Sequence, residues 1–235
     1  MNDEILLSKN LKLNNRYTII EKIARGGTST TYLAHDEKED LQVTVKILGF
    51  NEAQEWKILE LFEREAKVLK TLDHPNIPKY IDYFEFEENN NTYFVIVQEY
   101  IKGRTLRQAV KEGKYFTENE ALIMFTKLCK IINYFHSLQP PVIHRDINPN
   151  NVIITSDDDI FLVDFGAVGQ IARSTMAAAM ASTFVGTIGF MPPEQLYGKA
   201  SPASDIYSLG VTIIYILTAK EPVDFDMVNM KLNFK

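Results

Sequence analysis

The sequence predicts an α+β protein with two parts, because strand patterns concentrate in the first third of its 235 residues and helical patterns in the remainder. In the first part, short apolar runs bounded by turn residues occupy 17–48 and 79–99, and one helical pattern lies between them at 52–72. In the second part, helices are expected over 118–138 and 203–219.

Five strands are expected in the first part: Tyr17–Ile23, Thr30–Ala34, Leu41–Leu48, Lys79–Phe86 and Tyr93–Glu99. A Gly-Gly turn separates the first two strands, and a charged turn precedes the third. The polar loop Glu87–Thr92 is expected to join the last two. The helix at 52–72 places Phe62, Glu65 and Leu69 on one face.

Each expected helix has a start signal that satisfies its first backbone N–H groups. These signals are Asn51 with Gln54, the capping box Thr117-Glu118-Asn119-Glu120, and Ser201 followed by Pro202. Asp73-His74-Pro75 is expected to end the first helix. The segment 101–105, which contains Gly103, is the expected boundary between the two parts.

The composition, 46% hydrophobic and 24% charged, is that of an ordinary globular protein. A net charge of −6 argues against nucleic acid as a partner, since phosphate backbones select basic surfaces. The single cysteine, Cys129, cannot form an internal disulfide and is expected to be a core residue, which favours a cytoplasmic location. The start of the chain does not resemble a signal peptide, and the apolar stretch Leu209–Ala219 is too short to span a bilayer, so no membrane segment is expected.

Two charged residues interrupt apolar patterns. Lys46 lies within the strand Leu41–Leu48, and Glu65 lies on the apolar face of the helix at 52–72. Buried lysine and glutamate each need a partner, so one interpretation is an ion pair between them. The alternative, in which Lys46 extends toward solvent and Glu65 lies at the edge of the apolar face, fits these residues equally well.

The stretch NNVIITSDDDIFLVDFGA, residues 150–167, predicts a β-hairpin. A register across a four-residue turn, Ser-Asp-Asp-Asp, sets Asn151 opposite Asp164. With Asp146 nearby, these side chains would supply the hard oxygen atoms that suit Mg²⁺. The alternative is that Asn151 and Asp164 cap the adjacent turns.

Six short motifs follow one another along the chain. They are Ala24-Arg25-Gly26-Gly27-Thr28-Ser29, Lys46, Glu65, His144-Arg145-Asp146 with Asn151, Asp164-Phe165-Gly166, and Pro192-Pro193-Glu194. In this order they resemble the signature set of the protein kinases, most closely the bacterial serine/threonine kinases of the eukaryotic type. Each motif alone is weak, but six in the right order and spacing make chance a poor explanation.

The resemblance implies a catalytic role for three residues and a metal-binding role for two. Lys46, oriented by Glu65, would hold the α- and β-phosphates of ATP. Asp146 would accept the proton of the substrate hydroxyl, while Asn151 and Asp164 would bind Mg²⁺. ATP and Mg²⁺ are therefore the expected substrate and cofactor.

The resemblance also implies a set of nucleotide-binding positions. They are Ile23, Ala24, Arg25, Gly26, Gly27, Thr31, Thr44, Lys46, Gln98, Glu99, Ile101, Ile153 and Asp164. Glu99 and Ile101 would offer backbone groups to adenine. Asp205 resembles the buried aspartate that anchors the catalytic loop, and Arg145 would pair with a phosphate on one of Ser174, Thr175, Ser182 or Thr183.

The sequence departs from the family pattern at several points. Ala24 and Ser29 replace two of the three loop glycines, which predicts weaker ATP binding. Asn148 replaces a lysine that contacts the γ-phosphate and the catalytic aspartate, which we expect to slow the reaction. The arginine that normally pairs with Glu194 belongs to a part of the family fold beyond Lys235, so Glu194 is expected to lack its partner.

The implied fold is a two-lobed, protein-kinase-like α+β fold. An N-terminal extension at 1–16 precedes an N-lobe at 17–98, which consists of an antiparallel sheet with one helix. A mainly helical C-lobe follows at 99–235 and is expected to be incomplete, without the terminal helices. The implied function is transfer of the ATP γ-phosphate to a protein serine or threonine, with self-phosphorylation or a dimer left open. The alternatives are a pseudokinase that binds nucleotide or acts as a scaffold, and a small-molecule kinase of similar fold.

Overall fold

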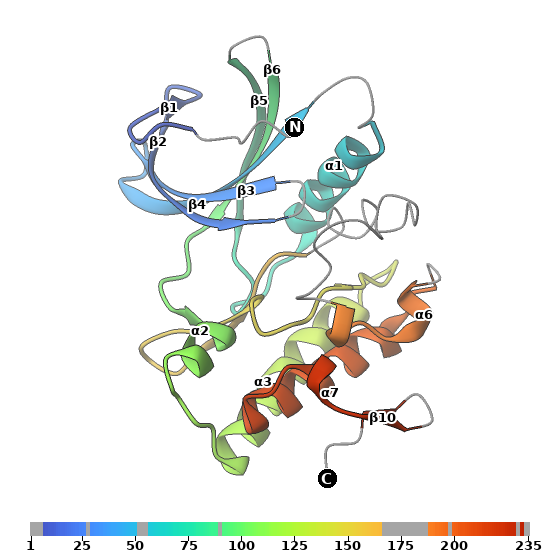
Figure 1. Cartoon of the computed structure of the whole chain (residues 1–235). Coiled ribbons are helices and arrows are strands. Elements are labelled where there is room, and N and C mark those ends of the chain that lie inside the picture. The colour runs from blue at the N-terminus through green and yellow to red at the C-terminus, as the bar shows by residue number, and fades with distance from the viewer. Residues whose placement is uncertain are drawn as a thin grey trace. The chain divides into compact units, whose positions relative to one another are not determined.

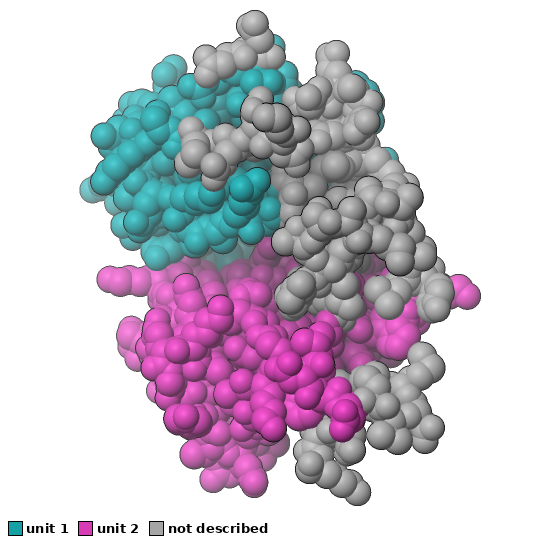
Figure 2. Space-filling view, in the orientation of Figure 1, with its two compact units in different colours: residues 1–73, 78–100, 167–175 teal, residues 74–77, 101–166, 176–235 magenta. Residues whose placement is uncertain are grey.

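The computed structural model describes residues 7–26, 29–50, 56–88, 91–165, 188–196, 199–228 and 231–232. These residues form two compact units (Figure 2). The first unit contains the described residues up to Asp73 together with Pro78–Tyr100. The second contains His74–Ile77 and the described residues from Ile101 onward.

The first unit is a six-stranded antiparallel sheet with one helix (Figure 1). Its strands, in the spatial order β1-β2-β3-β4-β6-β5, are β1 Lys12–Leu13, β2 Tyr17–Arg25, β3 Ser29–Asp36, β4 Leu41–Phe50, β6 Asn91–Glu99 and β5 Tyr80–Glu88. All five predicted strands are confirmed. The short strand β1 was not predicted, since two residues are too few to show an alternating pattern.

The predicted loop Glu87–Thr92 is too long. In the structure β5 continues to Glu88 and β6 begins at Asn91, with Glu87 paired to Thr92 and Glu88 to Asn91. These residues are polar because the end of the hairpin is partly exposed, and backbone pairing does not depend on apolar side chains. Polarity at this position marks exposure of the strands to solvent rather than a loop.

Helix α1, Trp56–Thr71, packs against β4 and β5. Phe62 and Leu69 are buried on the face that contacts the sheet. The helix ends before Asp73, as its stop signal predicts, whereas the proposed cap at Asn51 and Gln54 lies outside the described residues.

The second unit is mainly helical. Its described helices are α2 Leu106–Lys111, α3 Glu118–His136, η1 Ile188–Phe190, α6 Pro193–Leu196, α7 Pro202–Thr218 and η2 Pro222–Asp224. Its strands are β7 Arg104–Thr105, β8 Val152–Ile154 and β9 Ile160–Leu162 in one sheet, with β10 Met227–Val228 and β11 Lys231–Leu232 in a separate hairpin. Helices α3 and α7 pack against each other (Figure 1).

The predicted helix starts in the second unit are confirmed. The Thr117 hydroxyl accepts a bond from the Glu120 N–H at 3.2 Å, and the Glu120 carboxylate accepts one from the Thr117 N–H at 2.8 Å. Helix α7 begins at Pro202 after an extended Ser201. Helix α3 ends at His136 rather than at residue 138, and the Ser137 hydroxyl donates to the Tyr134 carbonyl at this end.

The expected register of the hairpin at 150–167 is wrong by one residue. Strand β8 pairs with β9 so that Val152 faces Leu162 and Ile154 faces Ile160. The Thr155 N–H donates to the Asp159 carbonyl at 3.0 Å, and Asp158 adopts a left-handed conformation with φ of 58°. The turn therefore has three residues instead of four, which aspartate permits because it tolerates positive φ.

Among the described residues, no helix is both long enough and apolar enough to cross a membrane. Cys129 is half-buried on α3, and burial raises the pKa of its thiol, as expected for a packed residue rather than a nucleophile.

Candidate active site

Lys46 and Glu65 form a buried ion pair in the first unit. Lys46 lies on β4, and Glu65 lies on the face of α1 that packs against the sheet. The Lys46 Nζ is 2.6 Å from the Glu65 Oε1, and the two residues are 8% and 1% exposed. The alternative in which Lys46 extends to solvent is therefore wrong. Burial of such a pair costs desolvation energy, so stability alone is a weak explanation for it.

The strand register places several predicted nucleotide-binding residues on the same face of the sheet as Lys46. Ala24 pairs with Thr31, and Thr31 pairs with Lys46. Thr44, two residues before Lys46 on β4, pairs with Gln98 on β6. Directly paired residues, and residues two apart on a strand, share a face. This face also carries the apolar residues Ile96, which pairs with Lys46 on β6, and Leu33, which pairs with Thr44 on β3.

The glycine-rich segment and the end of β6 are described in part. The Gly26 N–H donates to the Ser29 carbonyl at 2.8 Å, and Ile23 is 47% exposed, while Gly27 lies outside the described residues. At the end of β6, the Glu99 N–H donates to the Lys79 carbonyl at 2.9 Å. Because this bond occupies the Glu99 N–H, the Glu99 carbonyl oxygen is the backbone group of this residue that could bond to a ligand.

In the second unit, two amide side chains hold the Asp146 carboxylate. The Asn148 Nδ2 donates to Asp146 Oδ1 at 3.0 Å, and the Asn151 Nδ2 donates to Asp146 Oδ2 at 3.1 Å. Both amides also donate to the Asp146 carbonyl, at 3.1 Å and 2.8 Å. These contacts fix a half-buried carboxylate that can still accept a proton.

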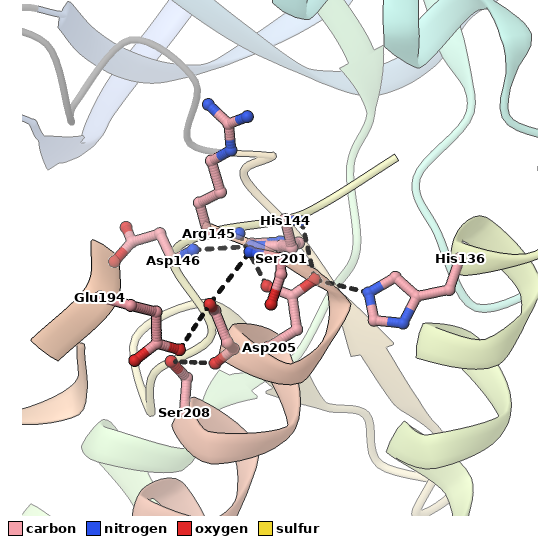
Figure 3. A network of polar contacts seen from close by, with 9 residues as sticks. His136, His144, Arg145, Asp146, Glu194, Ser201, Asp205 and Ser208 are labelled. Carbon is pink, nitrogen blue, oxygen red and sulfur yellow. Dashed lines mark hydrogen bonds and ion pairs between the residues drawn. The ribbon is translucent and has the colours of Figure 1, made fainter. Parts of the chain in front are cut away.

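The loop that carries Asp146 is anchored by Asp205, which is fully buried on α7. The His144 N–H donates to Asp205 Oδ2 at 3.0 Å, and the Arg145 N–H donates to Oδ1 at 2.8 Å. His136, in the last turn of α3, lies 2.8 Å from the same Oδ2 (Figure 3). Arg145 adopts positive φ, 66°, a strained conformation for a non-glycine residue, and these bonds hold it there.

The Pro192-Pro193-Glu194 segment contacts the same loop and the start of α7. The Gln195 Nε2 donates to the Arg145 carbonyl at 2.6 Å. Glu194 accepts a bond from the Ser204 hydroxyl at 2.9 Å, so the expectation that this carboxylate lacks a partner is wrong. Ser204, in the first turn of α7, therefore links this helix to α6.

The hairpin positions the remaining candidates. Ile153 pairs with Phe161 across β8 and β9, and the Val163 N–H donates to the Asn151 carbonyl at 2.9 Å. Asn151 is therefore opposite Val163, one residue before the predicted Asp164. Asp164 is exposed and left-handed, with φ of 59°, and the following Phe165 is buried against the His144 ring, 4.6 Å between centroids.

The donor set fits a divalent cation that also binds phosphate. Among the described residues, no group of three or more histidine, cysteine, aspartate or glutamate side chains is arranged to hold a metal. The Asn151 NH₂ group is occupied by Asp146, so its amide oxygen is the atom that could coordinate a cation. One amide oxygen and one carboxylate suit Mg²⁺, which is commonly held by few protein ligands plus substrate phosphates.

Comparison with known proteins identifies the family. A family model described as the protein kinase domain matches residues 17–233. The chain belongs to the protein kinase family. Serine/threonine-protein kinase B of Synechocystis is 38% identical over 92% of this chain and 39% of its own length, and PrkC of Bacillus subtilis is 33% identical over 91% and 32%. The chain thus spans about two fifths or less of the length of these relatives.

A solved kinase supports the same fold. The crystal structure of a mutant form of the Mycobacterium tuberculosis PknI kinase domain matches with a TM-score of 0.72 over 94% of this chain and 80% of that chain, at 24% identity. Membership of the kinase family implies ATP as substrate and use of a divalent metal. The fold predicted from the sequence, two-lobed and kinase-like, is therefore confirmed.

The sequence did not predict the contacts of three residues around the loop that carries Asp146. It did not single out His136 or Gln195, and it treated Asn148 only as a lost lysine. His136 is an isolated polar residue at the end of an apolar helix, and Gln195 follows a motif without belonging to it. Nothing in the sequence identifies their partners, because Asp205 is 69 residues from His136 and Arg145 is 50 residues from Gln195.

Proposed function

We propose that this kinase domain transfers the γ-phosphate of ATP to a protein serine or threonine with Mg²⁺. The observation that carries the proposal is the Asp146 carboxylate, held by amide donors from Asn148 and Asn151 in a loop whose backbone is bonded to buried Asp205. A carboxylate fixed in this way is prepared to orient a hydroxyl nucleophile and accept its proton.

In the second unit, Asp146 would act as the base, and Asn151 and Asp164 would hold Mg²⁺. The metal, when bound, would neutralise charge on the phosphates of the nucleotide. The bonds from Asp205 and Gln195 would keep the loop backbone in place during phosphoryl transfer. In this assignment residues 99–235 act as the C-lobe.

In the first unit, Lys46 would bind the α- and β-phosphates. Its ion pair with Glu65 fixes the ammonium group and balances its charge before the nucleotide binds. The face that carries Thr31, Thr44 and Gln98 would contact the nucleotide. In this assignment residues 17–98 act as the N-lobe.

The protein substrate is inferred from the relatives, which are named serine/threonine-protein kinases. A cytoplasmic location is proposed from the single cysteine. Self-phosphorylation at Ser174, Thr175, Ser182 or Thr183 is part of the proposal, and these positions lie outside the described residues.

The test is a transfer assay with γ-labelled ATP, Mg²⁺ and a generic basic protein. We expect label on protein with the wild type and none with Asp164→Ala, while Asp157→Ala, at an exposed position of the β8–β9 turn, keeps activity. A thermal shift with ATP but no label on protein would contradict the proposal and indicate a pseudokinase. Label found only on a small alcohol would indicate a small-molecule kinase instead.

A further inference from the structure

Asn148 occupies the position at which the family pattern has a lysine that contacts both the γ-phosphate and the catalytic aspartate. An asparagine brings no charge, so its function must lie in its hydrogen bonds. The side chain is only 3% exposed, which means that its polar atoms need partners within the protein. Those partners show whether Asn148 replaces the lysine's contact with the aspartate, its contact with the γ-phosphate, or both.

Both ends of the Asn148 amide are bonded within the catalytic loop. Its Nδ2 donates to Asp146 Oδ1 at 3.0 Å and to the Asp146 carbonyl at 3.1 Å. Its Oδ1 accepts the Asn150 N–H at 2.9 Å. An amide NH₂ has two donors, and both have acceptors here. No donor of Asn148 is therefore left for a phosphate.

The backbone fixes the position of this amide. The Asn151 N–H donates to the Asn148 carbonyl at 3.0 Å and closes a tight turn with Pro149 in its second position. The Asn148 side chain adds a bond across the same turn, to the Asn150 N–H. The amide is consequently aimed at Asp146 by a short and rigid segment.

The two amide side chains that contact Asp146 bond different oxygens of its carboxylate. Asn148 donates to Oδ1, and Asn151 donates to Oδ2 at 3.1 Å. Each carboxylate oxygen has two lone pairs, so one bond to each oxygen restricts rotation of the group and still leaves acceptors for a substrate hydroxyl.

We propose that Asn148 is a positioning residue that orients the Asp146 carboxylate and does not bind ATP. The inference rests on the proposed kinase function. In this chain Asn148 keeps the contact with the aspartate that the lysine makes in the family pattern, and it lacks the contact with the phosphate.

The test compares Asn148→Ala and Asn148→Ser in the full chain. The alanine variant removes both amide functions, whereas serine keeps an oxygen that can accept the Asn150 N–H and has one O–H donor, on a shorter side chain, in place of the two N–H donors that bond Asp146. Loss of a hydrogen bond to a charged group predicts a fall in kcat of about 10- to 100-fold in both variants. The dissociation constant of Mg-ATP, measured by calorimetry, is expected to stay at the wild-type value in both. Thermal stability should fall less in the serine variant.

Three results would overturn this inference. A weaker Mg-ATP dissociation constant in Asn148→Ala would make Asn148 a phosphate ligand, and wild-type kcat in that variant would exclude a positioning role. Wild-type kcat in Asn148→Ser would show that the two amide donors to Asp146 are not required, against the proposed positioning role. If the alanine variant does not fold, the serine variant carries the test. Failure of the kinase proposal itself is distinguishable, because the wild type would then transfer no phosphate to protein.

Discussion

At the scale of single residues, Asp205 is the buried aspartate that holds the backbone of the loop leading to Asp146. It accepts bonds from two backbone N–H groups of that loop and contacts His136. Its removal would leave these donors buried without an acceptor. We therefore expect Asp205→Ala to lower the free energy of unfolding by about 3–5 kcal/mol, measured by urea denaturation. Asp157→Ala, at an exposed position, is the matched control, and equal effects of the two substitutions would refute this account.

A second buried aspartate lies in the first unit, at the end of β3. Asp36 is fully buried and accepts two bonds from the Arg16 guanidinium, both at 2.7 Å. These bonds hold the pKa of the Asp36 carboxyl below its ordinary value of 3.8, with a smaller contribution from the Lys38 N–H. A pKa lowered by folding means that the ionised form stabilises the folded state.

The sign of this effect predicts a pH dependence. The stabilisation by Asp36 is fully present above the unfolded pKa and is lost as the pH falls through the lower, folded pKa. The difference in unfolding free energy between wild type and Asp36→Asn should therefore be constant between about pH 7 and pH 5 and shrink toward about pH 3. Urea denaturation across this range measures it. A difference that grew with acidity would show that the ion pair with Arg16 does not stabilise the fold.

At the scale of secondary-structure elements, Gly103 shows how one residue controls a strand junction. It precedes β7, which pairs with β8. A Cβ atom at this position would lie 2.6 Å from the Ile153 Cγ2 and would also clash with the Ile154 carbonyl oxygen. Since one of the contacts is backbone, the strand would have to shift, and Gly103→Ala should destabilise the protein by about 1–3 kcal/mol.

The control for this prediction is Gly210 in the middle of α7. A Cβ atom there meets nothing within 4 Å, so Gly210→Ala should leave stability unchanged or raise it by up to about 1 kcal/mol, because alanine is the better helix former. Thermal denaturation of both variants gives the comparison. Equal midpoints would mean that the β7–β8 junction adapts to the extra methyl group.

The elements also show what the sequence could and could not predict. Strands and helices were found because alternation, helical spacing and capping residues are local signals, as at Thr117 and Ser201. The register of β8 and β9 was missed because it depends on the conformation of one residue, Asp158. The amino-acid type alone does not show whether an aspartate adopts the left-handed conformation. The one-residue difference moved the partner of Asn151 from Asp164 to Val163.

At the scale of the whole molecule, the order of six motifs predicted the kinase family, which the comparisons then confirmed. Motif order indicates which residues are candidates for the chemistry, but it does not give their hydrogen bonds. The Lys46–Glu65 pair was left open because its partners are 19 residues apart on different elements. The link between Glu194 and Ser204 was not predicted because the resemblance implied an arginine as the partner of that glutamate, and no local pattern indicates a bond between a glutamate and a serine ten residues later.

The proposed site also predicts how metal and nucleotide depend on each other. Of the described residues, Asn151 and Asp164 alone are proposed to ligate the metal, so Mg²⁺ without nucleotide should bind weakly and leave the thermal midpoint unchanged. ATP with Mg²⁺ should raise the midpoint, with a stabilisation of about 2.7 kcal/mol when the ligand is at about 100 times its dissociation constant. ATP with a chelator should give a smaller shift, since phosphate charge is then not neutralised by the metal.

The Asp164→Asn variant separates the metal from the rest of the nucleotide site. It keeps the size of the side chain and removes the charge, so Mg-ATP and ATP with chelator should give nearly the same shift in this variant. Asp157→Asn in the β8–β9 turn should retain the full difference between the two conditions. A wild-type protein whose ATP shift is the same with and without Mg²⁺ would show that Asn151 and Asp164 do not form a metal site, and the proposed transfer would then need another cation to neutralise the charge on the phosphates.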